Sequence, residues 1–242
     1  MKHGATYVLV HGAWQGASTW QATVDRLRAR DHRVFTPTLT GLGDRSHQLT
    51  PAVDLEAHIK DVMMCLTYDD LRDVVLVGHS YGGMVITGVA ERARERVAKL
   101  VYVDAFVPED GDSALSLLPP PFQQAFREQA QTQGDGWRLP ASEKQLDIWG
   151  LKPGPAREFV RSKLCDFSLR CFEQAIRLPT DTTSIDRTYI ACVAPGYPAR
   201  PAFAPFAEKA KREGWRYHEL PAGHDCHVEL PDELAAILLG LA

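Results

Sequence analysis

The stretch Val74–Gly83 constrains the fold of this chain most, because it joins an apolar strand to a helix through the pattern G-x-S-x-G. Val74–Val77 are all apolar, as in a strand of a parallel sheet that is covered on both faces. The pattern places Ser80 on a sharp turn, with its hydroxyl raised above the sheet edge. Such a turn is crowded, so glycine at positions 78 and 82 leaves room that a side chain would fill.

Strand and helix patterns alternate along much of the chain. The other strand patterns are Tyr7–Val10, His32–Thr36, Leu100–Asp104, Arg187–Val193 and Arg216–Leu220. Helical patterns lie near Thr19–Arg30, Leu55–Leu66, Met84–Arg96, Phe203–Glu213 and Leu230–Leu241. This alternation predicts an α/β fold with a six-stranded, mostly parallel sheet, helices on both faces and right-handed crossovers.

Residues 106–179 interrupt the alternation. They carry three consecutive prolines and no strand pattern, but helical patterns recur around Phe122–Gln131, Glu143–Trp149, Ala156–Lys163 and Leu169–Ile176. The segment is too long for a plain loop. We therefore expect a helical lid at 106–179, inserted into a core formed by residues 1–105 and 180–242.

Composition limits the class of protein. A chain of 242 residues, with 45% hydrophobic and 24% charged residues, fits a soluble globular domain. A net charge of −4 does not suggest nucleic acid or an anionic membrane as a partner. The five cysteines form no C-x-x-C, which indicates reduced thiols in a cytoplasmic protein. We expect no leader or membrane span, a small-molecule substrate and, if the chain self-associates, a homodimer.

The loops that follow parallel strands meet at one edge of the sheet, where sites form. Ser80 is the candidate nucleophile and needs a base to take its proton. Histidine suits that task because its pKa lies near neutral pH. His224, in the loop after the last strand pattern, stands where the order Ser…Asp…His places the base. His227 is the competing candidate, and His11 and His79 are predicted to be structural.

Attack on a carbonyl creates an oxyanion, which requires preorganised N–H donors. The backbone amide of Tyr81, just after the serine, is one expected donor. The amide of Ala13, which follows His11-Gly12, is the other. We expect Trp14 and Tyr81 to contact the substrate, with packing beneath the lid as the alternative for Trp14.

Five motifs together resemble the α/β-hydrolase superfamily, and within it the small esterases related to plant methylesterases and hydroxynitrile lyases. They are Val10–Trp14, Thr40–His47, Gly78–Gly83, Val103–Pro108 and Gly223–Asp225. The resemblance runs from about Tyr7 to Leu241, most loosely in the lid. It implies the α/β-hydrolase fold and neither metal nor organic cofactor. It also implies the roles already assigned to Ser80, His224 and the amides of Ala13 and Tyr81.

Two departures from the family pattern stand out. Hydroxynitrile lyases of this group follow the catalytic histidine with lysine, whereas this chain has Asp225, which counts against cyanohydrin chemistry. The family usually places an aspartate after the fifth strand, but Cys192–Arg200 contains no carboxylate. Asp104 is our candidate for the missing acid, since its strand neighbours that of Ser80 and adjacent strands lie about 4.8 Å apart.

The acid has alternatives. Asp104 could instead cap the loop at 106–108, and Glu109, Asp110 and Asp112 are weaker candidates at the lid entrance. Asp225 adjoins His224 in the chain, which makes a side-on approach difficult.

These residues favour a serine hydrolase that cleaves a carboxylic ester of a small or medium apolar substrate through an acyl-serine intermediate. The unsettled acid keeps two other hypotheses open. One is a lyase, decarboxylase or cyclase on the same fold, and the other is a ligand-binding protein without catalysis.

Overall fold

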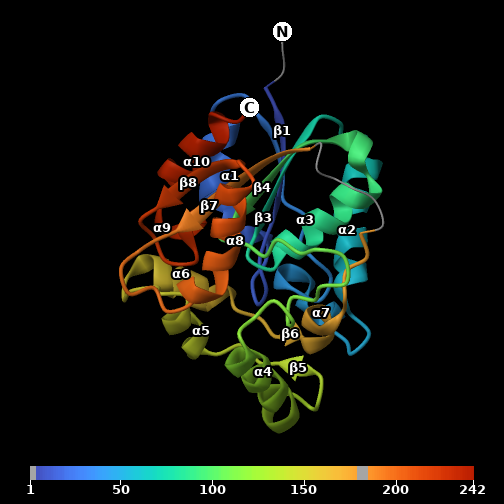
Figure 1. Cartoon of the computed structure of the whole chain (residues 1–242), viewed down its shortest axis with the longest axis vertical. Coiled ribbons are helices and arrows are strands. Elements are labelled where there is room, and N and C mark those ends of the chain that lie inside the picture. Colours follow the sequence, from blue (N-terminus) through green and yellow to red (C-terminus); the bar gives the residue numbers. More distant parts are fainter. Residues whose placement is uncertain (1–3, 179–184) are drawn as a thin grey trace.

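The computed structural model describes residues 4–178 and 185–242, and its centre is a six-stranded sheet in the order β2-β1-β3-β4-β7-β8 (Figure 1). Every neighbouring pair in this sheet is parallel. The strands are β1 (Thr6–Val10), β2 (Arg33–Phe35), β3 (Val74–His79), β4 (Val97–Val103), β7 (Asp186–Cys192) and β8 (Arg216–Leu220). The predicted six-stranded α/β sheet is confirmed.

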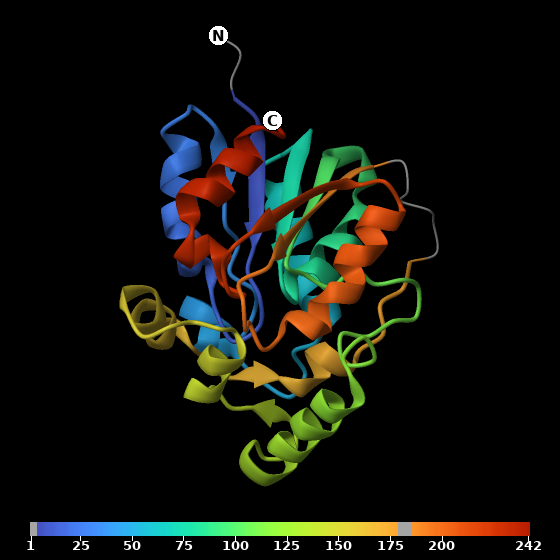
Figure 2. The ribbon, with the colours of Figure 1, turned by 60° about the vertical axis from the view of Figure 1, so that its left-hand side comes forward.

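Helices cover both faces of the sheet (Figure 2). One face carries α1 (Gln21–Arg28) and α10 (Pro231–Leu239), which pack on each other. The other carries α2 (Leu55–Tyr68), α3 (Gly82–Arg92) and α8 (Arg200–Arg212). Since both faces are covered, all residues of β3 are buried, as its apolar run predicts. Short helical turns are η1 (Ala17–Trp20), η2 (Gly43–Gln48), η3 (Arg94–Arg96) and α9 (Cys226–Glu229).

The long connection between β4 and β7 lies across the carboxyl end of the sheet (Figures 1 and 2). It contains α4 (Pro120–Gln133), α5 (Glu143–Ile148), α6 (Pro155–Lys163) and α7 (Leu169–Glu173), near the predicted helices. The expectation of no strands here is wrong, because β5 (Arg138–Leu139) pairs antiparallel with β6 (Phe167–Ser168). Strands of two residues are too short to leave a periodic pattern.

The segment's predicted end at Pro179 and the first three residues lie outside the described residues, so the domain boundaries at those points stay predictions. Within residues 4–178 and 185–242, no helix has the length and apolar character needed to cross a membrane.

Candidate active site

Ser80 occupies the turn between β3 and α3, with its backbone in the left-handed region at φ 55°. A Cβ atom at Gly78 would lie 2.6 Å from the carbonyl oxygen of Gly82, so only glycine fits there. The turn is tied to the end of β4, since Ser80 N donates to Val103 O at 3.2 Å. A non-glycine residue in this backbone region is strained and is held by its surroundings. The serine is thus presented on the tight turn that its motif predicts.

The loop after β1 lies against this serine. A Cβ atom at Gly12 would sit 2.9 Å from the Ser80 Cβ and 3.4 Å from its Oγ. Within the described part of the chain, no hydrogen bond uses the amide of Ala13 or that of Tyr81. Two backbone donors that directly follow these close-packed residues are therefore free to bind an oxyanion.

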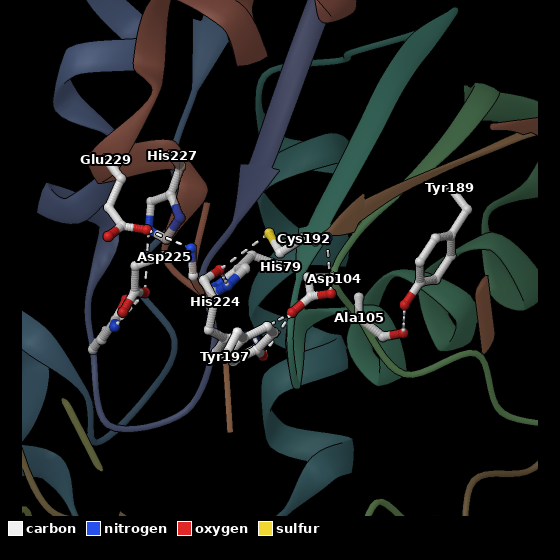
Figure 3. Close-up of polar contacts among 12 residues, drawn as sticks. His79, Asp104, Ala105, Tyr189, Cys192, Tyr197, His224, Asp225, His227 and Glu229 are labelled. Carbon is white, nitrogen blue, oxygen red and sulfur yellow. Dashed lines mark hydrogen bonds and ion pairs between the residues drawn. The ribbon is translucent and has the colours of Figure 1, made fainter. Parts of the chain in front are cut away.

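Asp104 and His224 meet beside this turn, although 120 residues separate them (Figure 3). Asp104 Oδ2 lies 2.7 Å from His224 Nδ1, and each residue is only 2% exposed. Asp104 directly follows β4 at φ 42°, and its other carboxylate oxygen accepts the Cys192 amide at 3.2 Å. His224 is anchored through its own amide to Trp149 O at 2.8 Å. The structure therefore brings together the two residues that the sequence nominated as acid and base.

Tyr197 is the residue of this site that sequence reasoning missed. Its hydroxyl donates to Asp104 Oδ2 at 2.8 Å and lies 2.9 Å from His224 Nδ1 (Figure 3). Burial, reinforced by the charge of Asp104, raises the pKa of Tyr197 well above its ordinary value, so the phenol stays protonated. The carboxylate that the family pattern places in this turn is absent from residues 194–200. The sequence signal for this residue is the tyrosine itself, a polar side chain in the turn where the acid is expected.

The other carboxylates considered for the acid bind elsewhere. Glu109 is exposed and pairs with Lys209. Asp110 accepts a hydrogen bond from the Leu178 amide. Asp112 accepts one from the Glu109 amide. Asp225 accepts a hydrogen bond from Gln15 at 2.8 Å. Among the described residues, Asp104 is the carboxylate that contacts the His224 ring.

His227 lies in the core rather than beside Asp104. It is 0% exposed, and within the described part of the chain neither ring nitrogen has a hydrogen-bond partner. Burial lowers its pKa to about 3, which keeps the ring neutral. The contact with Asp104 thus distinguishes His224 from His227 as the candidate base.

His11 and His79 brace the surrounding loops, as expected of structural histidines. His11 accepts the Leu39 amide at 3.1 Å. His79 Nε2 lies 2.9 Å from the carbonyl oxygen of His224, so it supports the loop that carries the base. Burial lowers the pKa of His11 to about 4 and that of His79 well below its ordinary value.

His79, Asp225 and His227 form the group, within the described residues, whose side chains could ligate a metal ion. One ligand atom from each lies within 4.8 Å of the others. Ligands bound at about 2.1 Å to a tetrahedral ion stand about 3.4 Å apart. His227 Nε2 and Asp225 Oδ1 stand 3.9 Å apart, which is wider than this spacing, and we assign the group no metal.

Trp14 and Tyr81 are both buried. The indole Nε1 of Trp14 donates to Leu139 O at 3.0 Å. Its ring packs against side chains of the β4–β7 connection, namely Phe126, Trp149, Phe167 and Phe172. The Tyr81 hydroxyl lies 3.0 Å from His58 Nδ1 and its ring is 0% exposed. Trp14 thus packs beneath the connection, and contact of either ring with substrate stays a prediction.

This chain is similar to known proteins in sequence and in fold. Residues 7–237 match the sequence model of the Alpha/beta hydrolase family. A carbendazim-hydrolysing esterase of Nocardioides sp. (strain SG-4G) is 41% identical over 248 residues, covering 98% of this chain and 99% of that protein. Salicylic acid-binding protein 2 of Nicotiana tabacum is 29% identical over 68% of this chain and 62% of its own length.

Among solved structures, an extracellular α/β-hydrolase from a Paenibacillus species superimposes with a TM-score of 0.81 at 23% identity, covering 98% of both chains. The predicted fold and the resemblance to small esterases are confirmed. The chain belongs to the α/β-hydrolase family and is a carboxylic-ester hydrolase.

Proposed function

We propose that this protein hydrolyses esters of small or medium apolar molecules through an acyl-serine intermediate. Ser80 is the nucleophile, His224 the base and Asp104 the acid that orients the base. The observation that carries this proposal is the buried 2.7 Å contact between Asp104 Oδ2 and His224 Nδ1. It supports Asp104 as the third partner, for which the sequence left several candidates.

The proposed chemistry follows from that contact. With Nδ1 held by Asp104, Nε2 is the ring nitrogen left to accept the Ser80 proton as Oγ bonds to the ester carbonyl carbon. The carboxylate stabilises the imidazolium, and the amides of Ala13 and Tyr81 bind the oxyanion. His224 then gives its proton to the departing alcohol. Water, deprotonated by the same ring, releases the acid and restores Ser80.

We further propose that residues 106–179 form a lid over this site. Ser80 is only 9% exposed, and aromatic rings of the connection pack on Trp14, which belongs to the same loop as Gly12, the residue that lies against Ser80. A substrate therefore requires displacement of part of this layer, and its aromatic lining favours apolar acyl or alcohol groups. Five free thiols support the proposed cytoplasmic location.

Two variants test the assignment, assayed with p-nitrophenyl acetate, p-nitrophenyl butyrate and carbendazim, the compound named for the Nocardioides relative. Ser80→Ala should abolish turnover and remove the covalent adduct that a fluorophosphonate forms in the wild type. Asp104→Asn should lower kcat by about ten-thousand-fold, as loss of the acid does in serine-protease triads. Glu109→Gln, which removes an exposed carboxylate, is the matched control and should keep the wild-type rate.

Full activity in Ser80→Ala would overturn the nucleophile assignment, and an unchanged rate in Asp104→Asn would remove the acid. The hypothesis of a lyase, decarboxylase or cyclase drew its support from the missing acid after the fifth strand, and the contact of Asp104 with His224 weighs against it. Turnover without a fluorophosphonate adduct at Ser80 would revive that hypothesis.

A further inference from the structure

We propose that Tyr197 is a positioning residue of the active site, whose hydroxyl shares the Asp104 oxygen with His224 and moderates the pull of that carboxylate on the Nδ1 proton. The inference rests on the proposed Ser80–His224–Asp104 triad and adds a fourth member to it.

Three polar atoms form a closed triangle (Figure 3). Asp104 Oδ2 to His224 Nδ1 is 2.7 Å, Tyr197 OH to Asp104 Oδ2 is 2.8 Å, and Tyr197 OH to His224 Nδ1 is 2.9 Å. An ionised carboxylate only accepts hydrogen bonds, so the single phenol proton goes to Oδ2. The proton on Nδ1 points to that same oxygen, with the phenol oxygen as a second acceptor.

This arrangement selects one tautomer of His224. If the ring proton moved to Nε2, the lone pair of Nδ1 would face the charged Asp104 oxygen at 2.7 Å. The phenol has only one proton, so it could not satisfy both atoms at once. The Nδ1–H form satisfies all three groups and leaves Nε2 free for the Ser80 proton.

Tyr197 is held firmly in this position. It is 5% exposed and lies on the turn between β7 and α8. Its amide donates to Ala194 O at 3.2 Å, and Ala199 N beyond it donates to Ile148 O at 3.0 Å. A Cβ atom at Gly150 would come within 3.2 Å of the Tyr197 ring, so the ring lies directly against that backbone.

The phenol also moderates the electrostatics of the pair. Two donors on Oδ2 and the Cys192 amide on Oδ1 disperse the negative charge of Asp104. Without the phenol, the carboxylate has fewer donors and attracts the proton of His224 more strongly. An imidazole that already holds both protons cannot accept the Ser80 proton.

Removal of the Tyr197 hydroxyl leaves the other titratable groups that face His224 unchanged. His79, whose ring centroid lies 4.5 Å away, and His227 are neutral because burial lowers their pKa values. Burial raises the pKa of the Cys192 thiol, which lies 3.9 Å from the His224 carbonyl oxygen. Burial also raises the pKa of Asp225, which is bound to Gln15.

The test is the pH profile of kcat/KM for p-nitrophenyl acetate in Tyr197→Phe. We expect its acidic limb to move to higher pH by about one unit, as loss of a hydrogen bond to a charged group implies. Above that limb kcat/KM should fall less than about tenfold, far less than in Asp104→Asn. Incorporation of 3-fluorotyrosine at position 197, whose more acidic phenol donates more strongly, should move the limb to lower pH.

Tyr189→Phe is the matched control. Its hydroxyl is equally buried but donates to Ala105 O at 3.1 Å (Figure 3), so its loss should leave the limb in place. A Tyr197→Phe limb that stays at the wild-type pH, with only a lower melting temperature, would mean a purely structural tyrosine and overturn the inference. The 3-fluorotyrosine variant decides the question if Tyr197→Phe does not fold. Activity in Ser80→Ala would instead reject the proposed triad, whatever the Tyr197 variants do.

Discussion

Replacing His227 by leucine should make the protein less sensitive to acid. The imidazole is 0% exposed and packs against the Trp20 ring at a centroid distance of 4.6 Å, with the two rings tilted by 35°. Within the described residues neither ring nitrogen has a hydrogen-bond partner, so leucine removes no hydrogen bond. Asp225 Oδ1 lies 3.9 Å from His227 Nε2, and the His79 ring packs on the His227 ring at a centroid distance of 4.5 Å. At pH 7 the free energy of unfolding should therefore change by less than about 1 kcal/mol.

The effect grows as the pH falls. Burial lowers the pKa of His227 from 6.5 to about 3, so between these values the unfolded chain binds a proton that the native protein does not. The free energy of unfolding consequently decreases as the pH drops below 6.5. At pH 5, about 1.5 units below the unfolded pKa, His227 alone costs about 2 kcal/mol. His11, with its pKa lowered to about 4, adds a similar loss in both proteins.

Urea unfolding at pH 7, 6 and 5, followed by tryptophan fluorescence, measures this difference. Between pH 7 and pH 5, His227→Leu should lose about 2 kcal/mol less stability than the wild type. His47→Gln is the control, since His47 is exposed and should leave the dependence unchanged. Equal losses in His227→Leu and wild type would refute the assignment of a neutral, buried imidazole.

Two further predictions concern the loop after β1 and the thiols. Gly12→Ala places a Cβ atom 2.9 Å from that of Ser80, so the loop must shift, and with it the amide of Ala13 that we propose as an oxyanion donor. Steady-state ester hydrolysis should show kcat lower by about a hundredfold, and a rate within about twofold of wild type would contradict this. Burial raises the pKa values of Cys65 and Cys165 to about 11 and that of Cys192 well above its ordinary value. A disulfide reagent at pH 8 should therefore label the native protein slowly, and it should label all five cysteines only after unfolding. Rapid labelling of the native thiols would refute this prediction.

The sequence by itself determined the elements whose formation is local. The apolar run before Ser80 and the glycines around it specify a buried strand and a tight turn, since each depends on neighbours in the chain. The alternation of strands and helices then predicted which strand ends would meet. On that basis Asp104 and His224 could be nominated for one site although 120 residues separate them.

The tertiary structure determined the contacts between side chains that lie far apart in the sequence. Tyr197 and Asp104 are 93 residues apart in the sequence, yet their side chains form a hydrogen bond. The spacing of apolar residues does not indicate in which direction a tyrosine hydroxyl points. The pairing of β5 with β6 escaped prediction because two residues carry no pattern. Likewise, whether His224 or His227 contacts Asp104 depends on packing around rings three residues apart. Hydrogen bonds of this kind are set by distances of tenths of an ångström, which only the packed fold establishes.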